Sequence, residues 1–431
     1  MNQLLPLTRL GREDYSEAAA RIRRRTGDLS AVEERAQAII ADVKRRGDEA
    51  LRELTLELDH AEIGEAIRVD EGVVRSSIAR VDPKLLDAMR FSLGRIRKTQ
   101  GQLLRRLTYT YVSNGFVVRT AARGLPSVGC YIPGGRAAYA STVLMTAGVA
   151  KLAGVRRVVV CTPPGSDGAV SDAILAACSL CGVDEVYRVG GAQSIAALAY
   201  GTDSVPKVSK IVGPGGLYVA VAKRLVSRDV QIDFFAGPTE IIVVGDGATD
   251  ARAAAWDLVG QAEHGADTLC GLITWDTGLA AEVREHVSRI ASSAERGEHV
   301  RGALAGGFTL LCRDEESAAG IVNALAPEHL ELMMKDPRRF AAMVDNAGMI
   351  LSGKYAPCAA SDYCVGTDHV IPTQGDAAAR SNLSVLDFVK LNWNVEGTRD
   401  GLRAVLPSLK RLAMAEGLPN HYKSAESRFK R

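Results

Sequence analysis

Val128-Gly-Cys-Tyr-Ile132 is a short apolar run rich in residues that favour β-strands, and Pro133-Gly-Gly135 ends it with a permissive turn. Similar runs recur downstream, at 158–161, 185–189, 210–212 and 241–244. Helix-like segments separate them, at 141–152, 170–180, 193–198 and 217–225. Strands that alternate with single helices predict βαβ units and a parallel sheet. The runs are apolar throughout rather than alternating, as expected when helices cover both faces of a sheet.

The segments on either side extend this α/β pattern. Apolar residues at helical spacing over 30–58 and 83–96 predict that roughly the first 120 residues are mainly helical. Beyond residue 250 the pattern predicts a helix at 253–264 and strands at 269–274 and 348–351. The tail from 385 onward is expected to be helical.

The composition indicates a globular protein with a sizeable core. The chain has 431 residues, of which 47% are hydrophobic, and a formal net charge of +2, which gives no electrostatic footprint for nucleic acid. No apolar run reaches the roughly 18 residues that suggest a membrane span, and the first residues do not follow a signal-peptide pattern. Eight scattered cysteines fit a reducing compartment, so we expect a cytoplasmic protein.

Glycine-rich turns follow the expected strands of the middle segment. They are Pro133-Gly-Gly135, Pro163-Pro-Gly165, Gly190-Gly191 and Gly213-Pro-Gly-Gly216. Ligands of open parallel sheets bind at the carboxyl ends of strands, where glycine lets the backbone approach closely. The spaced G-x-G-x-x-G fingerprint is absent from the sequence, so these turns favour a nucleotide-type crevice, with ordinary strand-to-helix turns as the alternative.

Four of the seven histidines lie among acids, amides and glycines, as expected for a metal or acid–base centre. Gln261 and His264 are three residues apart, so one helix face could present both to one ion; a core or capping histidine is the alternative. With Asp362 and His421 they make a nitrogen and oxygen donor set without a thiolate. Such a set suits zinc in an open, catalytic site better than magnesium or calcium.

Glu328 and His329 are neighbours that follow Pro327. Proline is expected to hold Ala326 in an extended conformation. If the pair lies on a loop, both side chains can face one pocket and each can act as a general base. In the alternative, Pro327 begins a helix and Glu328 merely interacts with the dipole of its first turn.

Taken together, these motifs resemble those of the histidinol dehydrogenase family over about residues 30 to 421. The stretches that carry the resemblance are Cys130-Tyr-Ile-Pro-Gly-Gly135, Ser141-Thr-Val-Leu-Met145, Gly190-Gly-Ala-Gln193, Ile211-Val-Gly-Pro-Gly215, Ala236-Gly-Pro238, Gln261-Ala-Glu-His-Gly265, Ala326-Pro-Glu-His-Leu330, Asn346-Ala-Gly348, Asp362-Tyr363, His369-Val-Ile-Pro-Thr373, Leu383-Ser-Val385 and Glu416-Gly-Leu418. No single stretch is specific, but the set is.

The resemblance implies an oxidation of L-histidinol through L-histidinaldehyde to L-histidine, the last steps of histidine biosynthesis, with two NAD molecules and one zinc ion per subunit. It implies zinc ligation by Gln261, His264, Asp362 and His421. His329 would accept the alcohol proton, and Glu328 would activate the water that attacks the aldehyde.

The resemblance also implies the binding residues. Tyr131, Gln193 and the position of Gly216 match cofactor contacts. Substrate contacts are implied for Thr239, Gln261, His264, His329, Asp362, His369, Glu416 and His421.

The fold implied is α/β, with two incomplete Rossmann-like parallel-sheet domains, a helical N-terminal segment and a small C-terminal helical piece. We divide the chain into an N-terminal extension (1–25), a first α/β domain (26–128 with 238–382) that carries most zinc and catalytic residues, a second Rossmann-like domain (129–237), and a helical segment (383–431). The last segment is expected to contact the partner subunit of an intertwined homodimer.

Four positions depart from the family pattern. Gly216 replaces asparagine, Thr239 replaces serine, Ser361 replaces glycine and Asp368 replaces asparagine. Relatives that act on other small polar alcohols, including a sulfonated diol, also carry threonine at the position of Thr239. A zinc- and NAD-dependent dehydrogenase of another such alcohol is therefore the alternative, and a zinc hydrolase is the alternative from another class.

Overall fold

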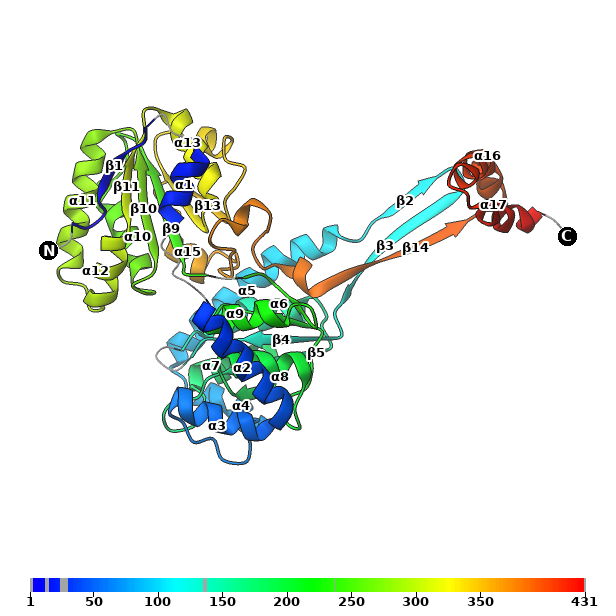
Figure 1. The fold of residues 1–431 in the computed structure, drawn as a ribbon, viewed down its shortest axis with the longest axis horizontal. Helices are drawn as coiled ribbons and strands as arrows, with labels where there is room; N and C mark the ends of the chain where they lie inside the picture. Colours follow the sequence, from blue (N-terminus) through cyan, green and yellow to red (C-terminus); the bar gives the residue numbers. More distant parts are fainter. Residues whose placement is uncertain (1–2, 12–14, 24–29, 135–137, 236, 430–431) are drawn as a thin grey trace.

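The computed structural model describes residues 3–11, 15–23, 30–134, 138–235 and 237–429. Two α/β bodies lie next to each other, and a long arm extends from them (Figure 1). Gly135 and Ala236, which belong to two of the family-like stretches, lie outside the described residues.

The first body is built on a sheet of five parallel strands, which we call sheet B. Its strands are β4 (Ser127–Tyr131), β5 (Arg157–Thr162), β6 (Glu185–Arg188), β7 (Lys210–Val212) and β8 (Gln231–Ile232). Their order, β6-β5-β4-β7-β8, is the 3-2-1-4-5 order of a dinucleotide-binding sheet, whose sixth position is not filled by any described strand. The predicted incomplete Rossmann-like domain is therefore confirmed.

Helices cover both faces of sheet B, which explains why its strands are apolar throughout. Val128 and Val160 belong to the core on one face, and Val159 and Ile211 to the core on the other. The first face is covered by α4 (Glu71–Ser76), α5 (Pro83–Arg106), α6 (Ala140–Leu152) and α7 (Asp172–Cys181). The second face is covered by α2 (Ser30–Arg46), α3 (Asp48–Asp59), α8 (Gly191–Tyr200) and α9 (Leu217–Val226).

This packing corrects the expected division of the chain. Residues 26–128 were assigned to one domain with 238–382, but the helices of 30–106 pack on sheet B. The buried stripe of α2, which includes Ile39 and Val43, packs against α8 and α9. The physical reason is that both faces of this parallel sheet must be covered, and its own crossover helices are too few to do so.

The second body contains sheet A, whose six strands are all parallel. They are, in spatial order, β1 (Leu7–Arg9), β11 (Phe308–Leu311), β10 (Leu269–Thr274), β9 (Glu240–Gly245), β12 (His329–Met333) and β13 (Met349–Ser352). The helices around it are α1 (Tyr15–Arg23), α10 (Ala251–Ala262), α11 (Thr277–Ala291), α12 (Gly297–Gly306), α13 (Glu315–Leu325), α14 (Pro337–Ala341) and α15 (Cys358–Tyr363). Strands β9 to β13 repeat the 3-2-1-4-5 order, so the second incomplete Rossmann-like sheet is confirmed too.

One expectation for this body was wrong, and one strand was missed. The described residues within 1–25 are not a separate extension, because β1 pairs with β11 and α1 packs against α13. The strand β12 was not predicted at all.

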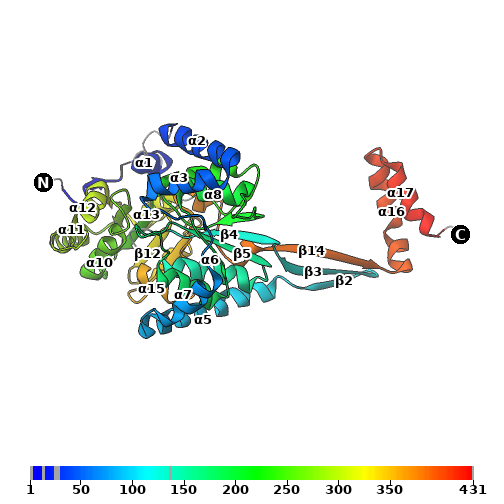
Figure 2. The same cartoon turned by 90° about the horizontal axis from the view of Figure 1, so that it is seen from below.

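The arm is a three-stranded antiparallel sheet that ends in two helices (Figure 2). It consists of β2 (Thr110–Ser113), β3 (Phe116–Gly124), β14 (Val389–Gly397), α16 (Arg399–Ala415) and α17 (Pro419–Glu426). The expectation of helix throughout 383–431 was therefore wrong for β14. Short 3-10 turns complete the described structure, at Ser77–Ala79, Asp376–Ala378, Val385–Phe388 and Ser427–Phe429. No helix in the described residues is long and apolar enough to span a membrane.

The turn after β7 supplies a stability test. Gly213 has φ of +117°, and a β-carbon there would lie 2.1 Å from the carbonyl oxygen of Tyr131. Replacement by alanine should lower the free energy of unfolding by about 1–3 kcal/mol or more, measured by denaturant titration. Gly216 is the matched control, because its β-carbon would meet nothing within 4 Å. Equal stability of Gly213→Ala and Gly216→Ala would contradict this account of the turn.

Candidate active site

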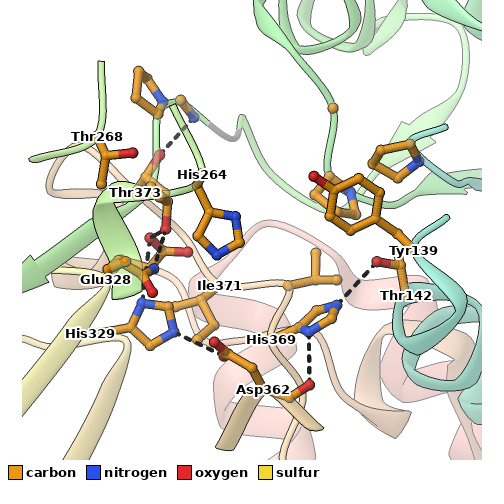
Figure 3. Close-up of a pocket in the computed structure, with 18 of the residues that line it drawn as sticks. Tyr139, Thr142, His264, Thr268, Glu328, His329, Asp362, His369, Ile371 and Thr373 are labelled. Atoms are coloured by element: carbon orange, nitrogen blue, oxygen red, sulfur yellow. Dashed lines mark hydrogen bonds and ion pairs between the residues drawn. The ribbon is translucent and has the colours of Figure 1, made fainter. Parts of the chain in front are cut away.

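A cavity of about 290 Å³ lies where the two bodies meet (Figure 3). Sheet B contributes the carboxyl ends of two neighbouring strands, through Pro133 after β4 and the turn 214–216 after β7. Sheet A contributes the opposite edge, because Thr239, Thr268 and His329 lie at the amino ends of β9, β10 and β12. The expected location at strand carboxyl ends thus holds for sheet B alone.

Two buried glutamates tie β9 to β12 at this edge. The backbone N–H of Glu240 donates to Oε2 of Glu328 (2.6 Å), and the backbone N–H of Glu328 donates to Oε2 of Glu240 (3.2 Å). The other oxygen of Glu240 accepts from the backbone N–H of Gln374 (2.9 Å), next to the pocket segment 369–373. Burial and the charge of Glu328 raise the pKa of Glu240 to about 7. The exchange of hydrogen bonds fixes the position of the Glu328 carboxylate.

Thr239 links Glu328 to Gln261. Its hydroxyl donates to Oε2 of Glu328 (2.6 Å) and accepts from Nε2 of Gln261 (2.8 Å). Nε2 of the Gln261 amide is used by Thr239, and Oε1 accepts a hydrogen bond from the thiol of Cys358. The hydroxyl that was expected to contact substrate is engaged with two protein groups in this structure.

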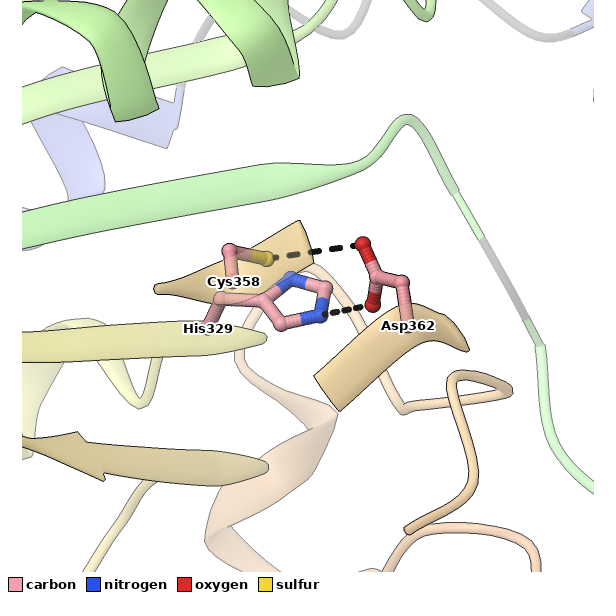
Figure 4. Close-up of side chains that lie close together, drawn as sticks. All are labelled: His329, Cys358 and Asp362. Carbon is pink, nitrogen blue, oxygen red and sulfur yellow. Dashed lines mark hydrogen bonds and ion pairs between the residues drawn. The ribbon is translucent and has the colours of Figure 1, made fainter. Parts of the chain in front are cut away.

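His329 begins β12 and is fixed in one tautomer. Its Nδ1 lies 3.1 Å from the carbonyl oxygen of Glu240, which can only accept, so Nδ1 carries the proton. The other nitrogen, Nε2, has no hydrogen-bond partner and lies 3.5 Å from Oδ1 of Asp362 (Figure 4). Burial opposes protonation of His329, but the carboxylates of Glu328 and Asp362 outweigh it and raise its pKa well above the ordinary value. When His329 gives up its second proton, Nε2 is the nitrogen left as a base, because Nδ1 keeps its proton for the carbonyl oxygen of Glu240.

The structure rules out the helix alternative for this stretch and corrects the expected conformation of Ala326. Pro327 does not begin a helix, because α13 ends at Leu325 and His329 starts a strand. Ala326 is not extended but left-handed, with φ of 41°, as the C-cap of α13. Even so, the side chains of Glu328 and His329 both reach the pocket, as expected for a pair of bases.

Three of the four expected zinc ligands line the pocket, namely Gln261, His264 and Asp362. Figure 3 shows the last two of them. Gln261 lies in the last turn of α10, which ends at Ala262 rather than at the expected residue 264, so His264 lies just beyond the helix. Asp362 comes from α15. Oδ1 of Asp362 is buried without a hydrogen-bond partner, which is consistent with a ligand that completes it. An amide oxygen, an imidazole and a carboxylate are donors that suit zinc, so these residues fit the ion.

The fourth expected ligand is elsewhere in the chain. His421 and the expected substrate residue Glu416 lie at the tip of the arm, in and next to α17, and both are exposed (Figure 1). Neither lines the pocket of its own chain.

His369 lies on the sheet B side of the pocket. Its Nδ1 is 3.0 Å from the backbone oxygen of Asp362, and its Nε2 is 3.1 Å from Oγ1 of Thr142. Both ring nitrogens are therefore engaged within the protein. Burial lowers the pKa of His369, so the ring is neutral and Thr142 donates to Nε2.

The three expected cofactor residues gather at the carboxyl edge of sheet B. Gly216 lines the pocket at the start of α9, and a β-carbon on the neighbouring Gly215 would lie 3.0 Å from the ring of Tyr131. Gln193, in α8, is fully buried, and neither polar atom of its amide has a partner in the described residues. An orphaned amide beside glycine turns fits a polar cofactor.

Three residues of the site were not singled out from the sequence: Thr142, Glu240 and Cys358. Glu240 could have been found from the sequence, because it directly precedes the apolar run 241–244 and a buried glutamate there needs hydrogen-bond partners. Thr142 and Cys358 carry none, since both lie in small-residue helical sequence.

Two Rossmann-like sheets that meet at a pocket of imidazoles, carboxylates and glycine turns define an α/β enzyme with a dinucleotide-type crevice. The sequence profile described as histidinol dehydrogenase matches residues 22–429. Histidinol dehydrogenase of Gluconobacter oxydans is 42% identical over 97% of this chain and 97% of its own length. The protein of that name from Methanosarcina barkeri is 38% identical over 96% of each chain.

A solved structure agrees. The crystal structure of histidinol dehydrogenase from Elizabethkingia anophelis superposes with a TM-score of 0.92 at 30% identity, covering 99% of this chain and 98% of that one. This chain belongs to the histidinol dehydrogenase family, whose members are NAD-dependent oxidoreductases.

The hydroxyl of Thr239 supplies a testable prediction. Thr239→Val removes the acceptor that orients Gln261, so binding of added zinc should weaken about 10–100-fold, measured by competition with a chelator. Thr239→Ser keeps the hydroxyl and should bind zinc as the parent does. The orienting role would be refuted by equal zinc affinities for the two variants.

Proposed function

We propose that this chain oxidises L-histidinol through L-histidinaldehyde to L-histidine, with two NAD molecules used in succession and one zinc ion per subunit. The observation that carries the proposal is that one pocket is lined both by candidate metal donors and by two candidate bases. Gln261, His264 and Asp362 converge as metal donors, while Glu328 and His329 offer two distinct bases next to them. A four-electron oxidation with a hydration between its two steps needs both bases.

A zinc ion bound by Gln261, His264, Asp362 and His421 would supply positive charge that binds and orients the polar groups of the substrate. NAD bound in the crevice would accept the hydride that leaves carbon in each oxidation. In the alcohol step, Nε2 of His329 accepts the hydroxyl proton, because Glu240 holds the ring with Nδ1 protonated. Between the steps, Glu328 takes a proton from the water that attacks the aldehyde, and Thr239 keeps its carboxylate in place.

For NAD we propose the carboxyl edge of sheet B. The turn 213–216 precedes α9, so its backbone can approach a pyrophosphate at the start of that helix. Tyr131 and Gln193 lie at the same edge, which favours this location. The side-chain amide of Gln193 has no hydrogen-bond partner among the described residues, so it could bind the cofactor. Gly216 leaves room where the family has an amide side chain, so this contact is lost or made by the backbone.

For the active assembly we propose a homodimer. Apolar side chains along the arm are exposed, which favours their burial against a second copy. They include Tyr111, Val112, Leu391, Trp393, Val395, Leu412 and Met414. The arm would carry His421 and Glu416 to the pocket of the other subunit, which supplies the fourth ligand and a substrate contact.

A coupled assay tests the proposed reaction. NADH is followed by absorbance with histidinol as substrate, and histidine is then quantified. The expected ratio is two NADH per histidine. If other small polar alcohols reduce NAD but histidinol does not, the substrate is one of those alcohols instead. If no alcohol reduces NAD, the proposal is overturned.

Replacing Glu328 separates the two steps. Glu328→Gln keeps the size of the side chain but cannot accept the water proton, so oxidation of the aldehyde should slow by about 100-fold or more. The alcohol step should partly survive, which single-turnover measurements of the first NADH would detect. If both steps slow equally, Glu328 does not act on the water.

A further inference from the structure

A buried ion pair lies behind the glycine turn that follows β7. Nζ of Lys223, in α9, pairs with Oδ1 of Asp233, which directly follows β8. The two side chains are 1% and 0% exposed, and the reaction proposed above uses neither of them. Taking two charges out of water is costly, and an apolar pair of similar volume is often at least as stable. Stability alone therefore does not account for this pair.

The ion pair holds both backbone groups of one residue, Gly213. The N–H of Gly213 donates to Oδ2 of Asp233 (2.8 Å), and its carbonyl oxygen accepts from Nζ of Lys223 (2.9 Å). Oδ1 of Asp233 also accepts from the backbone N–H of Phe234 (2.7 Å), so both carboxylate oxygens are used within the protein. Together these contacts fix the two peptide groups on either side of Gly213. An apolar pair could fill the same space but could not make these hydrogen bonds.

The turn 213–216 needs such support from outside. Gly213 has φ of +117°, and glycine adopts many other values as readily, so the sequence of the turn does not fix its conformation. The rest of the turn lines the pocket, and Gly216 begins α9 without a side-chain cap. The first N–H groups of α9 are therefore available to a ligand. Their directions depend on how Gly213 is held.

We propose that Lys223 and Asp233 are positioning residues for NAD, because their ion pair holds Gly213 so that the backbone N–H groups after Pro214 face the pocket before the cofactor binds. This rests on the proposed location of NAD at the turn 213–216. Both charged groups are buried and neutralise each other, so they act through the backbone rather than on the cofactor itself. A turn that is held in advance loses less conformational entropy when NAD binds.

The alternative is that the pair only stabilises the packing of α9 on sheet B. A single substitution does not separate the two roles, because the remaining partner would be an unpaired buried charge that destabilises the whole body. A double substitution does separate them. Lys223→Met with Asp233→Asn removes both charges at nearly constant volume, and Gly213 then keeps at most one of its two hydrogen bonds.

The test compares two double variants of the full-length protein. The control, Lys210→Met with Asp387→Asn, removes a similar ion pair (2.8 Å) at the amino end of the same strand, β7. Lys223→Met with Asp233→Asn should weaken NAD binding by about 10–100-fold, measured by calorimetry, and should raise KM for NAD more than it lowers kcat. The control should bind NAD as the parent does. Zinc affinity should be unchanged in both, because the proposed donors belong to the other body.

Equal NAD affinity of the two folded double variants would overturn the positioning role and leave the proposed reaction standing. The reaction itself is tested on the parent, whose failure to oxidise any alcohol with NAD would overturn the proposed function. The two failures are therefore distinguishable.

Hydrogen exchange of the parent decides the question even if the first double variant does not fold. Because its N–H is bound to a buried carboxylate, Gly213 should exchange slowly without NAD and should not change when NAD is added. Gly215 and Gly216 should exchange fast and become protected by NAD. If Gly213 is protected only after NAD binds, the cofactor and not the ion pair orders the turn. If NAD protects none of the three, it does not bind at this turn, and the positioning role is overturned whatever the histidinol assay shows.

Discussion

The exchange of hydrogen bonds between Glu240 and Glu328 is the constraint on which the site depends. Backbone N–H groups at the start of a strand lack the ladder partners of residues farther along. Here two carboxylates accept from them across neighbouring strands. Burial of two acids in contact is costly unless they are hydrogen-bonded, and here both oxygens of Glu240 and Oε2 of Glu328 accept hydrogen bonds. The carbonyl oxygen of Glu240 also sets the tautomer of His329. The backbone of Glu240 therefore positions both bases, Glu328 through its N–H and His329 through its carbonyl oxygen.

The two sheets serve the site from opposite edges. Sheet B follows the general rule for open α/β sheets, with glycine turns at the carboxyl ends of β4 and β7, where the strand order reverses. Sheet A has the same order but offers its amino edge, where backbone N–H groups and the hydroxyl of Thr239 donate to two buried carboxylates. The proposed cofactor and the proposed metal therefore reach one cavity from different bodies, and the reacting atoms can lie between them.

The α/β class and both parallel sheets were predictable because buried strands and crossover helices leave local patterns, such as the apolar runs at 158–161 and 269–274. The strand β12 was missed because Pro327 and Glu331 interrupt its apolar pattern. β14 was missed because its partner β3 lies some 270 residues away in sequence and its faces are exposed. The motifs predicted that Gln261, His264 and Asp362 share one site, and the structure places all three at one pocket. No local pattern in the sequence indicates that Cys358 lies close to Gln261 and Asp362.

The proposal that each site combines the body of one chain with the arm of another can be tested with mixed dimers. His421→Ala and Glu328→Gln each damage every site when present alone. If the arm acts in the other subunit, a mixed dimer keeps one intact site, built from a normal Glu328 and the partner subunit's His421. Random exchange of subunits should then restore about one quarter of the parental rate. If activity stays at the level of the separate variants after exchange, the arm does not complete the site of its partner.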